Sequence, residues 1–339
     1  MTLDIVPLDA ADAGMMAAWH ACYDAAQVFG TQYPMSWMLE EMRAQFLADT
    51  PGERTLGFCG YVDGVLVTTG TCTLPLMDNL HLAHVEVCTH PEQRHRGHGS
   101  AMLDHLTVLA REHGRRTLAA EASTPYDGPA DGSGHPHADF LLHRGFSWAL
   151  GDVLRVLDLP VEESLLHRLA DDAAPHHRDY EIRQFKGPVP DEVIDSFGTL
   201  IGSLMTEAPT GSLEVETEVF DAARIRADER VFAASGRTKY TTVAVAPDGA
   251  VAAYSELVVP GYEPGRVYQW GTLARPDHRG HRLGQATKAR NLLWLQAEHP
   301  QPALLVTYNA EVNTRMIGVN ELLGFRPVGR LGEYQKQLP

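Results

Sequence analysis

Leu82-Ala83-His84-Val85-Glu86-Val87-Cys88-Thr89-His90-Pro91-Glu92-Gln93-Arg94-His95-Arg96-Gly97-His98-Gly99-Ser100 is the stretch that decides the fold. Residues 82–89 are predicted to form a strand, and a helix is predicted from Ser100 to His113. A loop between a strand and a helix offers backbone N–H groups and the positive end of a helix, which together with flanking cations suit a pyrophosphate. Glycines there keep side chains from blocking a close approach of the phosphates. We therefore predict that Arg94-x-x-Gly97-x-Gly99 binds a pyrophosphate.

Two better-known phosphate loops do not fit this stretch. It contains neither the Gly-x-Gly-x-x-Gly pattern of dinucleotide-binding domains nor the Gly-Lys-Ser/Thr of nucleotide triphosphatases. Taken alone, the pattern is also that of an ordinary glycine-rich turn.

A second copy of the pattern makes the ordinary turn a poor explanation. Pro276-Asp277-His278-Arg279-Gly280-His281-Arg282-Leu283-Gly284 lies 185 residues after the first loop, and the hairpin signals Asp63-Gly64 and Asp248-Gly249 have the same spacing. A Gly-Phe pair closes each copy, at 145–146 and 324–325, so the first copy holds about six extra residues, which we place in 123–135. We predict an N-terminal domain at 1–160, a helix and linker at 161–177 and a C-terminal domain at 178–339.

Composition limits the classes of function. The chain has 339 residues, 44% hydrophobic residues and a formal charge of −16, which fits two folded domains and disfavours nucleic acid or an anionic membrane as a partner. It shows no apolar stretch near the roughly 20 residues of a membrane span. Its four cysteines lack paired spacing, so we expect a reducing, cytoplasmic location. A small-molecule partner fits best, and the sequence does not indicate the oligomeric state.

The two loops and their surroundings resemble the GNAT acetyltransferase superfamily, whose Gln/Arg-x-x-Gly-x-Gly/Ala loop binds the pyrophosphate of acetyl-CoA. In copy two the resemblance extends to Asn309-Ala310-Glu311-Val312-Asn313 and to the ending Asn320-Glu321-Leu322-Leu323-Gly324-Phe325. The tandem layout is similar to that of mycothiol synthase. The resemblance implies an α/β (α+β) fold in which each domain has a mixed, mostly antiparallel central sheet flanked by helices. It also implies acetyl-CoA as acyl donor and no metal.

Each copy departs from the family pattern. Copy one has Gly134 where copy two has Asn313, and copy two has Arg282 at the place of Gly97. The usual helix tyrosine of the family matches Leu141 in copy one and Asn320 in copy two. The cofactor-binding residues that the resemblance implies are Val87, Cys88, Thr89, Arg94, His95, Arg96, Gly97, His98, Gly99, Ser100, Thr272, Leu273, Ala274, Arg279, Gly280, His281, Arg282, Leu283, Gly284, Gln285, Asn309 and Asn313.

Amide formation from a thioester needs a neutral amine, so a base or a water chain must remove its proton. Glu86, on the strand before the first loop, is the preferred candidate, and Glu121 on the next strand is the second. Copy two has Gly271 at the place of Glu86 and would depend on Glu256, or on a water held by Tyr254 or Tyr308. Strand N–H groups of Val87 or Cys88, and of Thr272 or Leu273, are expected to stabilise the thioester oxygen.

Other candidate residues have simpler structural explanations. His135, His137 and His143 lack the spacing of a zinc site, so no metal is expected. Trp19, Tyr33 and Trp37 are read as core residues rather than as the lining of an acceptor pocket, and Glu207 as part of a capping loop rather than a holder of a cationic substrate.

The sequence thus predicts an acyl-CoA-dependent N-acyltransferase acting on an amine of a small molecule. Two alternatives remain: a non-catalytic module that binds CoA or sequesters a ligand, and the same fold with a longer acyl-CoA or an aminoacyl-tRNA as donor. The acceptor is not identified, because acceptor sites of this superfamily are built from variable helices and loops.

Overall fold

The repeat in the sequence forms the same series of elements twice in the computed structural model, which describes residues 3–339. Unit 1 consists of the chain up to residue 151 together with residues 331–339, and unit 2 consists of residues 152–330. The strands of both units belong to one 12-stranded sheet, and each unit has its own strands and helices, which are described separately below.

Unit 1 begins with a short strand and two helices that precede a hairpin. Its elements are β1 (Asp4–Pro7), α1 (Ala13–Val28), α2 (Leu39–Phe46), β2 (Glu53–Val62), β3 (Val65–Pro75), β4 (Leu82–Thr89), the 3-10 turn η1 (Pro91–Gln93), α3 (His98–Glu112), β5 (Thr117–Pro125) and α4 (Pro136–Leu142).

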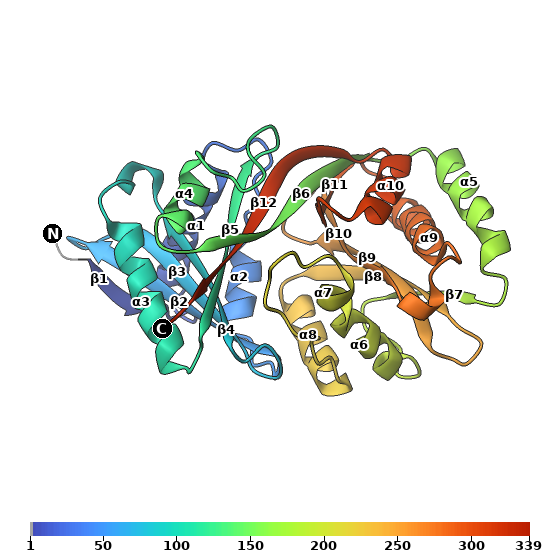
Figure 1. Ribbon diagram of the computed structural model, residues 1–339, viewed down its shortest axis with the longest axis horizontal. Coiled ribbons are helices and arrows are strands. Elements are labelled where there is room, and N and C mark those ends of the chain that lie inside the picture. Colours follow the sequence, from blue (N-terminus) through green and yellow to red (C-terminus); the bar gives the residue numbers. More distant parts are fainter. Residues whose placement is uncertain (1–2) are drawn as a thin grey trace. The chain divides into compact units, whose positions relative to one another are not determined.

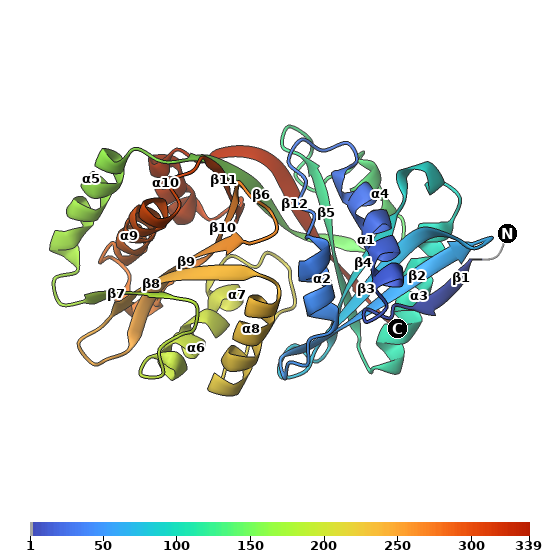
Figure 2. The same ribbon diagram turned by 180° about the vertical axis from the view of Figure 1, so that it is seen from behind.

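The sheet of unit 1 has the order β1-β2-β3-β4-β5, followed by the end of β12 (Arg326–Gln337). Strands β1 to β4 are antiparallel neighbours, whereas β4 and β5 run parallel. Helix α3 covers one face, where Met102 and Leu106 are buried, and α1 covers the other, where Trp19 and Tyr23 are buried. Figure 1 shows α3 in front of this sheet, and Figure 2 shows α1 and α2 on the opposite face.

Unit 2 repeats this plan with additional helices. Its elements are β6 (Ser147–Leu159, from residue 152), α5 (Glu163–Ala173), η2 (Ala174–His176), β7 (Glu181–Lys186), α6 (Ile194–Gly202), α7 (Leu204–Glu207), α8 (Ala222–Ala234), β8 (Arg237–Val245), β9 (Val251–Pro260), β10 (Arg266–Ala274), η3 (Pro276–His278), α9 (Leu283–Glu298), β11 (Ala303–Ala310), α10 (Thr314–Leu323) and the start of β12.

Strands of unit 2 lie in the order β6-β11-β10-β9-β8-β7, and again one parallel pair, β10 with β11, stands among antiparallel pairs. Helices α5 and α9 pack on one face against Tyr240 and Leu257, and α6 packs on the other against Val243 and Tyr254. Figure 1 shows α5, α9 and α10 gathered together in this unit. The predicted fold class, a mixed and mostly antiparallel sheet flanked by helices in each of two repeats, is confirmed.

The units differ in extent from the predicted ranges 1–160, 161–177 and 178–339. Residues 163–173 form α5, whose Leu166 and Leu169 are buried in the core of unit 2, so little of 161–177 is a free linker. Strand β6 pairs with β11 over Asp152 to Leu159, whereas the Leu338 N–H donates to the Arg116 carbonyl in unit 1. The repeat alone could not show this exchange of final strands, because strand pairing is non-local.

The two Asp-Gly pairs form different turns. Asp63 and Gly64 both have positive φ, at 50° and 79°, which is the two-residue hairpin expected from the sequence. In unit 2 only Gly249 has positive φ, and the Ala246 N–H bonds to the Ala250 carbonyl around a longer turn. None of the helices within residues 3–339 combines the length and the apolar character that a bilayer crossing needs.

Candidate functional site

Loop 1, residues 90–97, joins β4 to α3 in unit 1. His95 and Gly97 have φ of 61° and 86°, and Gly97 is the N-cap of α3. The backbone N–H groups of residues 95–100 donate no hydrogen bond within the described part of the chain. Six consecutive free amides at a helix N-terminus form an anion-binding concavity. Loop 1 therefore has a backbone geometry that suits a pyrophosphate, and the binding itself stays a prediction.

Three arginines surround loop 1. Arg94 donates to the carbonyls of Thr89 and Ala26, at 3.4 and 3.3 Å. Arg96 donates to the Gln93 side chain at 2.9 Å, and Arg144 donates to Ser100 Oγ at the start of α3. None of the three is paired with a carboxylate in residues 3–339. Their positive charges are thus held in place without being neutralised.

The two glycines of loop 1 are needed for different reasons. A Cβ at Gly97 would meet open space, so its positive φ is the constraint. A Cβ at Gly99 would lie 3.1 Å from Thr89 Oγ1 and 3.4 Å from Phe140 Cε2, so packing is the constraint there.

Loop 2, residues 275–282, has the same backbone in unit 2. Positive φ recurs at the equivalent positions, 89° at Gly280 and 52° at Arg282, the N-cap of α9. Each loop therefore contains one glycine and one larger residue at these two positions, in opposite order. The backbone N–H groups of residues 280–285 also lack an acceptor among residues 3–339. Arg282 does not abolish the cradle, because its backbone adopts the conformation that Gly97 has in unit 1.

Side chains of loop 2 are held by the rest of unit 2. Arg279 forms a 2.8 Å ion pair with Glu207, so Glu207 neutralises a loop cation. Arg282 donates to the Asp172 carbonyl at 3.2 Å, and Gln285 to the Leu169 carbonyl at 2.8 Å. His281 Nδ1 lies 2.9 Å from the His176 carbonyl oxygen. Loop 2 thus offers a ligand fewer free cations than loop 1.

Strands β4 and β5 separate just before loop 1. Their parallel pairing ends at His84 with Ala119. Glu86 and Glu121 follow two residues later on each strand, so they occupy facing positions where the strands part. Gln27 Nε2, from α1, donates to Glu86 Oε1 at 2.5 Å. Glu86 and Glu121 thus form a carboxylate pair where the strands separate, on the face of the sheet that α1 covers.

Burial and the neighbouring charge of Glu121 raise the pKa of Glu86 to about 7, and the hydrogen bonds with Cys88 and Gln27 oppose this shift in part. A carboxylate whose pKa lies near the working pH exchanges protons efficiently in both directions. Glu86 is therefore suited to proton exchange near neutral pH, and its role as a base stays a prediction.

The His90 N–H donates to the Val67 carbonyl, which fixes the alternation of hydrogen bonds along β4. Because antiparallel pairing alternates, the Cys88 N–H faces β3 and the Val87 N–H faces the opened edge toward β5. In unit 2 the Arg275 N–H donates to the Ala252 carbonyl, which by the same argument directs the Thr272 N–H toward β11. Val87 and Thr272, rather than Cys88 and Leu273, direct their N–H groups toward the opening between strands.

The position of Glu86 has no carboxylate in unit 2. A Cβ at Gly271 would lie 2.1 Å from Tyr254 Oη, so the buried tyrosine fills the space that a side chain would need. Glu256 forms a 3.0 Å ion pair with Lys239 and is 6% exposed. Neither Tyr254 nor Glu256 is placed as a counterpart of Glu86.

The asparagines of unit 2 have structural partners. Asn313 is the N-cap of α10, where its side chain accepts from the Met316 N–H at 3.2 Å. Asn309 Oδ1 accepts from Asn320, and Asn320 Oδ1 accepts from Lys288 Nζ at 2.6 Å. Asn309 stands at the end of β11, where it faces the opening between strands, whereas Asn313 acts on its own helix.

Other predicted assignments fall as follows. Trp19 is fully buried and donates to the Phe58 carbonyl at 3.0 Å, which makes it a core residue. His135 caps α4, and its ring lies 4.7 Å from that of His137. Within residues 3–339 there is no group of three or more histidine, cysteine or acidic side chains arranged to hold a metal.

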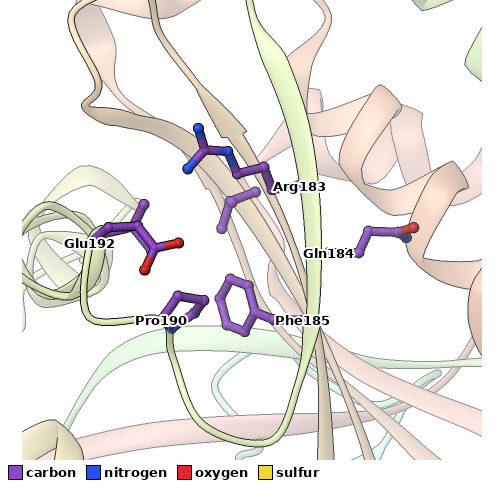
Figure 3. A pocket seen from close by; sticks show the side chains of 7 residues that line it. Arg183, Gln184, Phe185, Pro190 and Glu192 are labelled. Carbon is purple, nitrogen blue, oxygen red and sulfur yellow. The ribbon is translucent and has the colours of Figure 1, made fainter.

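Two hollows lie in unit 2. One, of about 290 Å³, is bounded by β7 and residues 190–193; in Figure 3, Arg183 and Glu192 point into it above Phe185, and Gln184 points away. The other, of about 500 Å³, lies beside loop 2 and is lined by Ser196, Thr199, Leu200, Ser203, Glu207, Arg275, Pro276 and Asp277. The first contains none of the predicted site residues, and the second touches only the start of loop 2.

Two residues of the site were missed in the sequence. Gln27 holds Glu86 from a helix 59 positions away, and Arg144 reaches Ser100 across 44 positions. Neither belongs to a local motif. Only the three-dimensional packing of α1 and α4 brings them to the site.

Comparisons with known proteins agree with this arrangement. Residues 19–130 match the acetyltransferase (GNAT) family. A tandem GNAT protein from the clavulanic acid biosynthesis pathway, solved without acetyl-CoA, is similar at 26% identity and a TM-score of 0.76, over 99% of this chain and 98% of that one. A GCN5-related N-acetyltransferase from Sphaerobacter thermophilus is similar in fold, at 11% identity and a TM-score of 0.59, over 99% and 95% of the two chains.

A putative acetyltransferase from Pyrococcus horikoshii is also similar in fold, at 11% identity and a TM-score of 0.54, over 99% of this chain and 90% of that one. No curated protein matches the chain in sequence. The chain therefore carries a GNAT-family acetyltransferase domain in residues 19–130 and has, over its whole length, the fold of a tandem GNAT protein.

Proposed function

We propose that this protein transfers an acyl group, most simply acetyl from acetyl-CoA, to the amine of a small molecule, and that unit 1 performs the reaction. The observation that supports this most strongly is the position of Glu86. Its pKa is raised to about 7, and it lies where β4 and β5 part, on the strand that leads into the six free amides of residues 95–100. The family match at residues 19–130 includes all of these residues.

In this proposal the loop 1 amides and Arg94, Arg96 and Arg144 bind the pyrophosphate of the donor. The pantetheine arm extends between β4 and β5, and the Val87 N–H bonds the thioester oxygen. An alkyl amine with a pKa near 10 costs about 4 kcal/mol to deprotonate at pH 7. Glu86 accepts that proton, the amine nitrogen attacks the thioester carbon, the carbon–sulfur bond breaks, and the CoA thiolate takes up a proton.

Unit 2 is assigned a binding role rather than a second reaction. Its loop keeps the free amides, but Gly271 and Tyr254 leave no carboxylate at the position of Glu86. We propose that both loops hold a CoA-type ligand and that the reaction depends on unit 1. The four cysteines are buried free thiols, which is compatible with action in the cytoplasm.

Binding is tested first, by following the melting temperature of the full chain with acetyl-CoA, longer acyl-CoAs and aminoacyl-tRNA. A ligand specific for the native state raises it by mass action. We expect acetyl-CoA to bind with a Kd in the micromolar range. No shift at millimolar acetyl-CoA would remove the donor assignment and leave the fold assignment intact.

Catalysis is tested by thiol release from acetyl-CoA with a panel of amines, comparing the wild type with Glu86→Gln and Gly99→Val. Both variants should lose turnover, and Gly284→Val, the matched change in loop 2, should reduce affinity or stability more than rate. Acetyl-CoA binding without turnover for any amine would favour a non-catalytic CoA-binding module. Activity that survives Gly99→Val but not Gly284→Val would transfer the reaction to unit 2.

A further inference from the structure

Strand β6 carries a buried arginine in unit 2 that has no protein partner. Arg155 is 6% exposed, and its guanidinium makes no hydrogen bond or ion pair with any residue in 3–339. Removing a charge from water without compensation is costly, and a buried guanidinium is normally paired. Nε of Arg155 is buried without a hydrogen-bond partner, whereas its two terminal nitrogens stay accessible, so an anion bound there would pair a charge that no described residue pairs.

The register of β6 with β11 places Arg155 on the face covered by α10. Arg155 is opposite Thr307, with the pairs Leu157–Leu305 and Val153–Asn309 on either side, and directly opposed residues share a face. Helix α10 touches both ends of this set, since Asn320 bonds Asn309 and a Cβ at Gly324 would lie 3.6 Å from Leu157. The last turn of α10 thus extends across the region of Arg155.

A second donor faces the same region. Asn309 Oδ1 accepts from Asn320, whose own oxygen accepts from Lys288, and this chain fixes how the Asn309 amide is turned. The Asn309 Nδ2 group has no acceptor among residues 3–339. Asn309 is half-buried on the part of β11 that lies beyond its last pair with β10, Tyr268 with Val306.

The acids of unit 2 nearest in sequence to these donors do not pair with them. Asp152 lies on the opposite face of β6 by strand alternation, Asp158 is 3.7 Å from Arg326, and Glu311 is 2.8 Å from Arg330. The Arg155 guanidinium and the Asn309 amide therefore form no hydrogen bond or ion pair with a carboxylate of unit 2.

Unit 1 shows that the fold does not require a polar lining here. The buried face of α3 carries Met102, Leu103 and Leu106, and the equivalent positions of α9 carry Thr287, Lys288 and Asn291, all at most 3% exposed. The same helix packs on the same sheet with apolar side chains in one unit and polar ones in the other. Polar groups in unit 2 are thus specific to that unit.

We propose that Arg155 and Asn309 bind the carboxylate of a small molecule that enters unit 2 between β10 and β11. A guanidinium and an amide N–H₂ supply several donors to the two oxygens of one carboxylate, and charge-assisted bonds of this kind are strong. Because Arg155 is 6% exposed, an end group of the ligand reaches it and the rest of the molecule stays in the opening.

This inference rests on the proposed function in one respect: it assumes that the opening between β10 and β11 holds a ligand. The carboxylate belongs either to the acyl group of a CoA thioester or to a separate molecule. Malonyl-CoA and malonate represent these two sources, and acetyl-CoA is the thioester without a carboxylate.

The experiment measures the affinity of the full chain for malonate, malonyl-CoA and acetyl-CoA by calorimetry. We expect one of the two carboxylate probes to bind the wild type and to bind Arg155→Met about ten- to a hundredfold more weakly. The affinity of Arg155→Lys for that probe should lie between the affinities of the wild type and of Arg155→Met. Arg290→Met, which removes an exposed arginine of α9, should bind as the wild type does. Acetyl-CoA affinity should be equal in all four proteins.

Stability gives a second readout. Arg155→Met should melt no lower than the wild type, because it replaces an unpaired buried charge by an apolar side chain of similar length. A lower melting temperature would show a protein partner for Arg155 and overturn the site, as would equal affinity of the carboxylate probes for the wild type and Arg155→Met. Loss of acetyl-CoA binding in every protein would refute the proposed function, and malonate binding through Arg155 would still support this site.

Discussion

Replacing Lys288 by methionine should stabilise unit 2 near neutral pH. Lys288 is 1% exposed on α9, and Asn320 Oδ1 is the acceptor for its amine. Burial lowers the pKa of Lys288 from 10.5 to about 7. That gap corresponds to about 5 kcal/mol of destabilisation at pH 7 and below. The variant leaves Asn320 without its donor, which costs about 1–3 kcal/mol. The net expectation is a gain of about 2–4 kcal/mol at pH 7.

The pH dependence distinguishes this account from a simple packing effect. Between pH 7 and 10.5 the unfolded chain binds a proton at Lys288 and the folded chain does not, so wild-type stability from this group rises with pH. The advantage of Lys288→Met should therefore shrink by about 1.4 kcal/mol per pH unit over that range.

Urea denaturation followed by circular dichroism at pH 7, 8, 9 and 10 measures this trend. Lys186→Met, which removes an exposed lysine paired with Glu298, is the control and should change stability by less than about 1 kcal/mol. A less stable Lys288→Met at pH 7, or an advantage that does not vary with pH, would refute the reasoning.

Three further predictions concern the site and the two units. With an amine that the enzyme accepts in the thiol-release assay, the wild-type rate should rise as pH increases through about 7, because Glu86 acts as a base only when ionised. Glu86→Gln should lower kcat about 10²- to 10⁴-fold and remove this rise. A rise with pH that persists in Glu86→Gln would exclude Glu86 as the base. Gly271→Ala should destabilise the chain by about 1–3 kcal/mol because its Cβ would meet Tyr254 Oη at 2.1 Å. Gly284→Ala, whose Cβ would lie 3.9 Å from the nearest atom, Thr272 Cγ2, is its control in thermal melting, and equal melting temperatures for the two would contradict this account. A chain ending at residue 330 should have a less stable unit 1, because Thr117 loses its hydrogen bond with Gln337 and Arg116 loses its hydrogen bond with Leu338. The fluorescence of Trp19, which is buried in unit 1, should report this loss during unfolding. An unchanged Trp19 signal during unfolding would count against it.

Much of the fold could be predicted from the sequence because the decisive signals are local. The glycine-rich loops and the duplicated spacing stand in short stretches of sequence, and the structure contains a strand, a loop and a helix at each of them. Glu86 was singled out by its place on the strand before the first loop, and the structure adds why its carboxylate holds a proton near neutrality: burial and Glu121 across the opening.

What could not be predicted depends on contacts between distant residues. Gln27 reaches the site from helix α1, Arg144 from the turn after α4, and Tyr254 fills the space at Gly271 from a neighbouring strand. Arg282 looked like a departure from the pattern in the sequence. Its backbone nevertheless has the φ that Gly97 has, and Gly280 takes the position of His95. A pattern of residue letters does not reveal that two loops with glycines at different positions share one backbone.

Because the final strands are exchanged between the units, the two units cannot be completed in the order in which they are synthesised. Unit 2 is one continuous stretch, residues 152–330, whereas unit 1 needs residues 331–339. Domains usually fold in the order in which they leave the ribosome. Here unit 1, the first to emerge, must wait for residues 331–339, so the proposed catalytic unit becomes complete only after all of unit 2 has been synthesised. A truncated product of translation would thus lack a finished catalytic unit, although the sequence of its loop and of Glu86 would be intact.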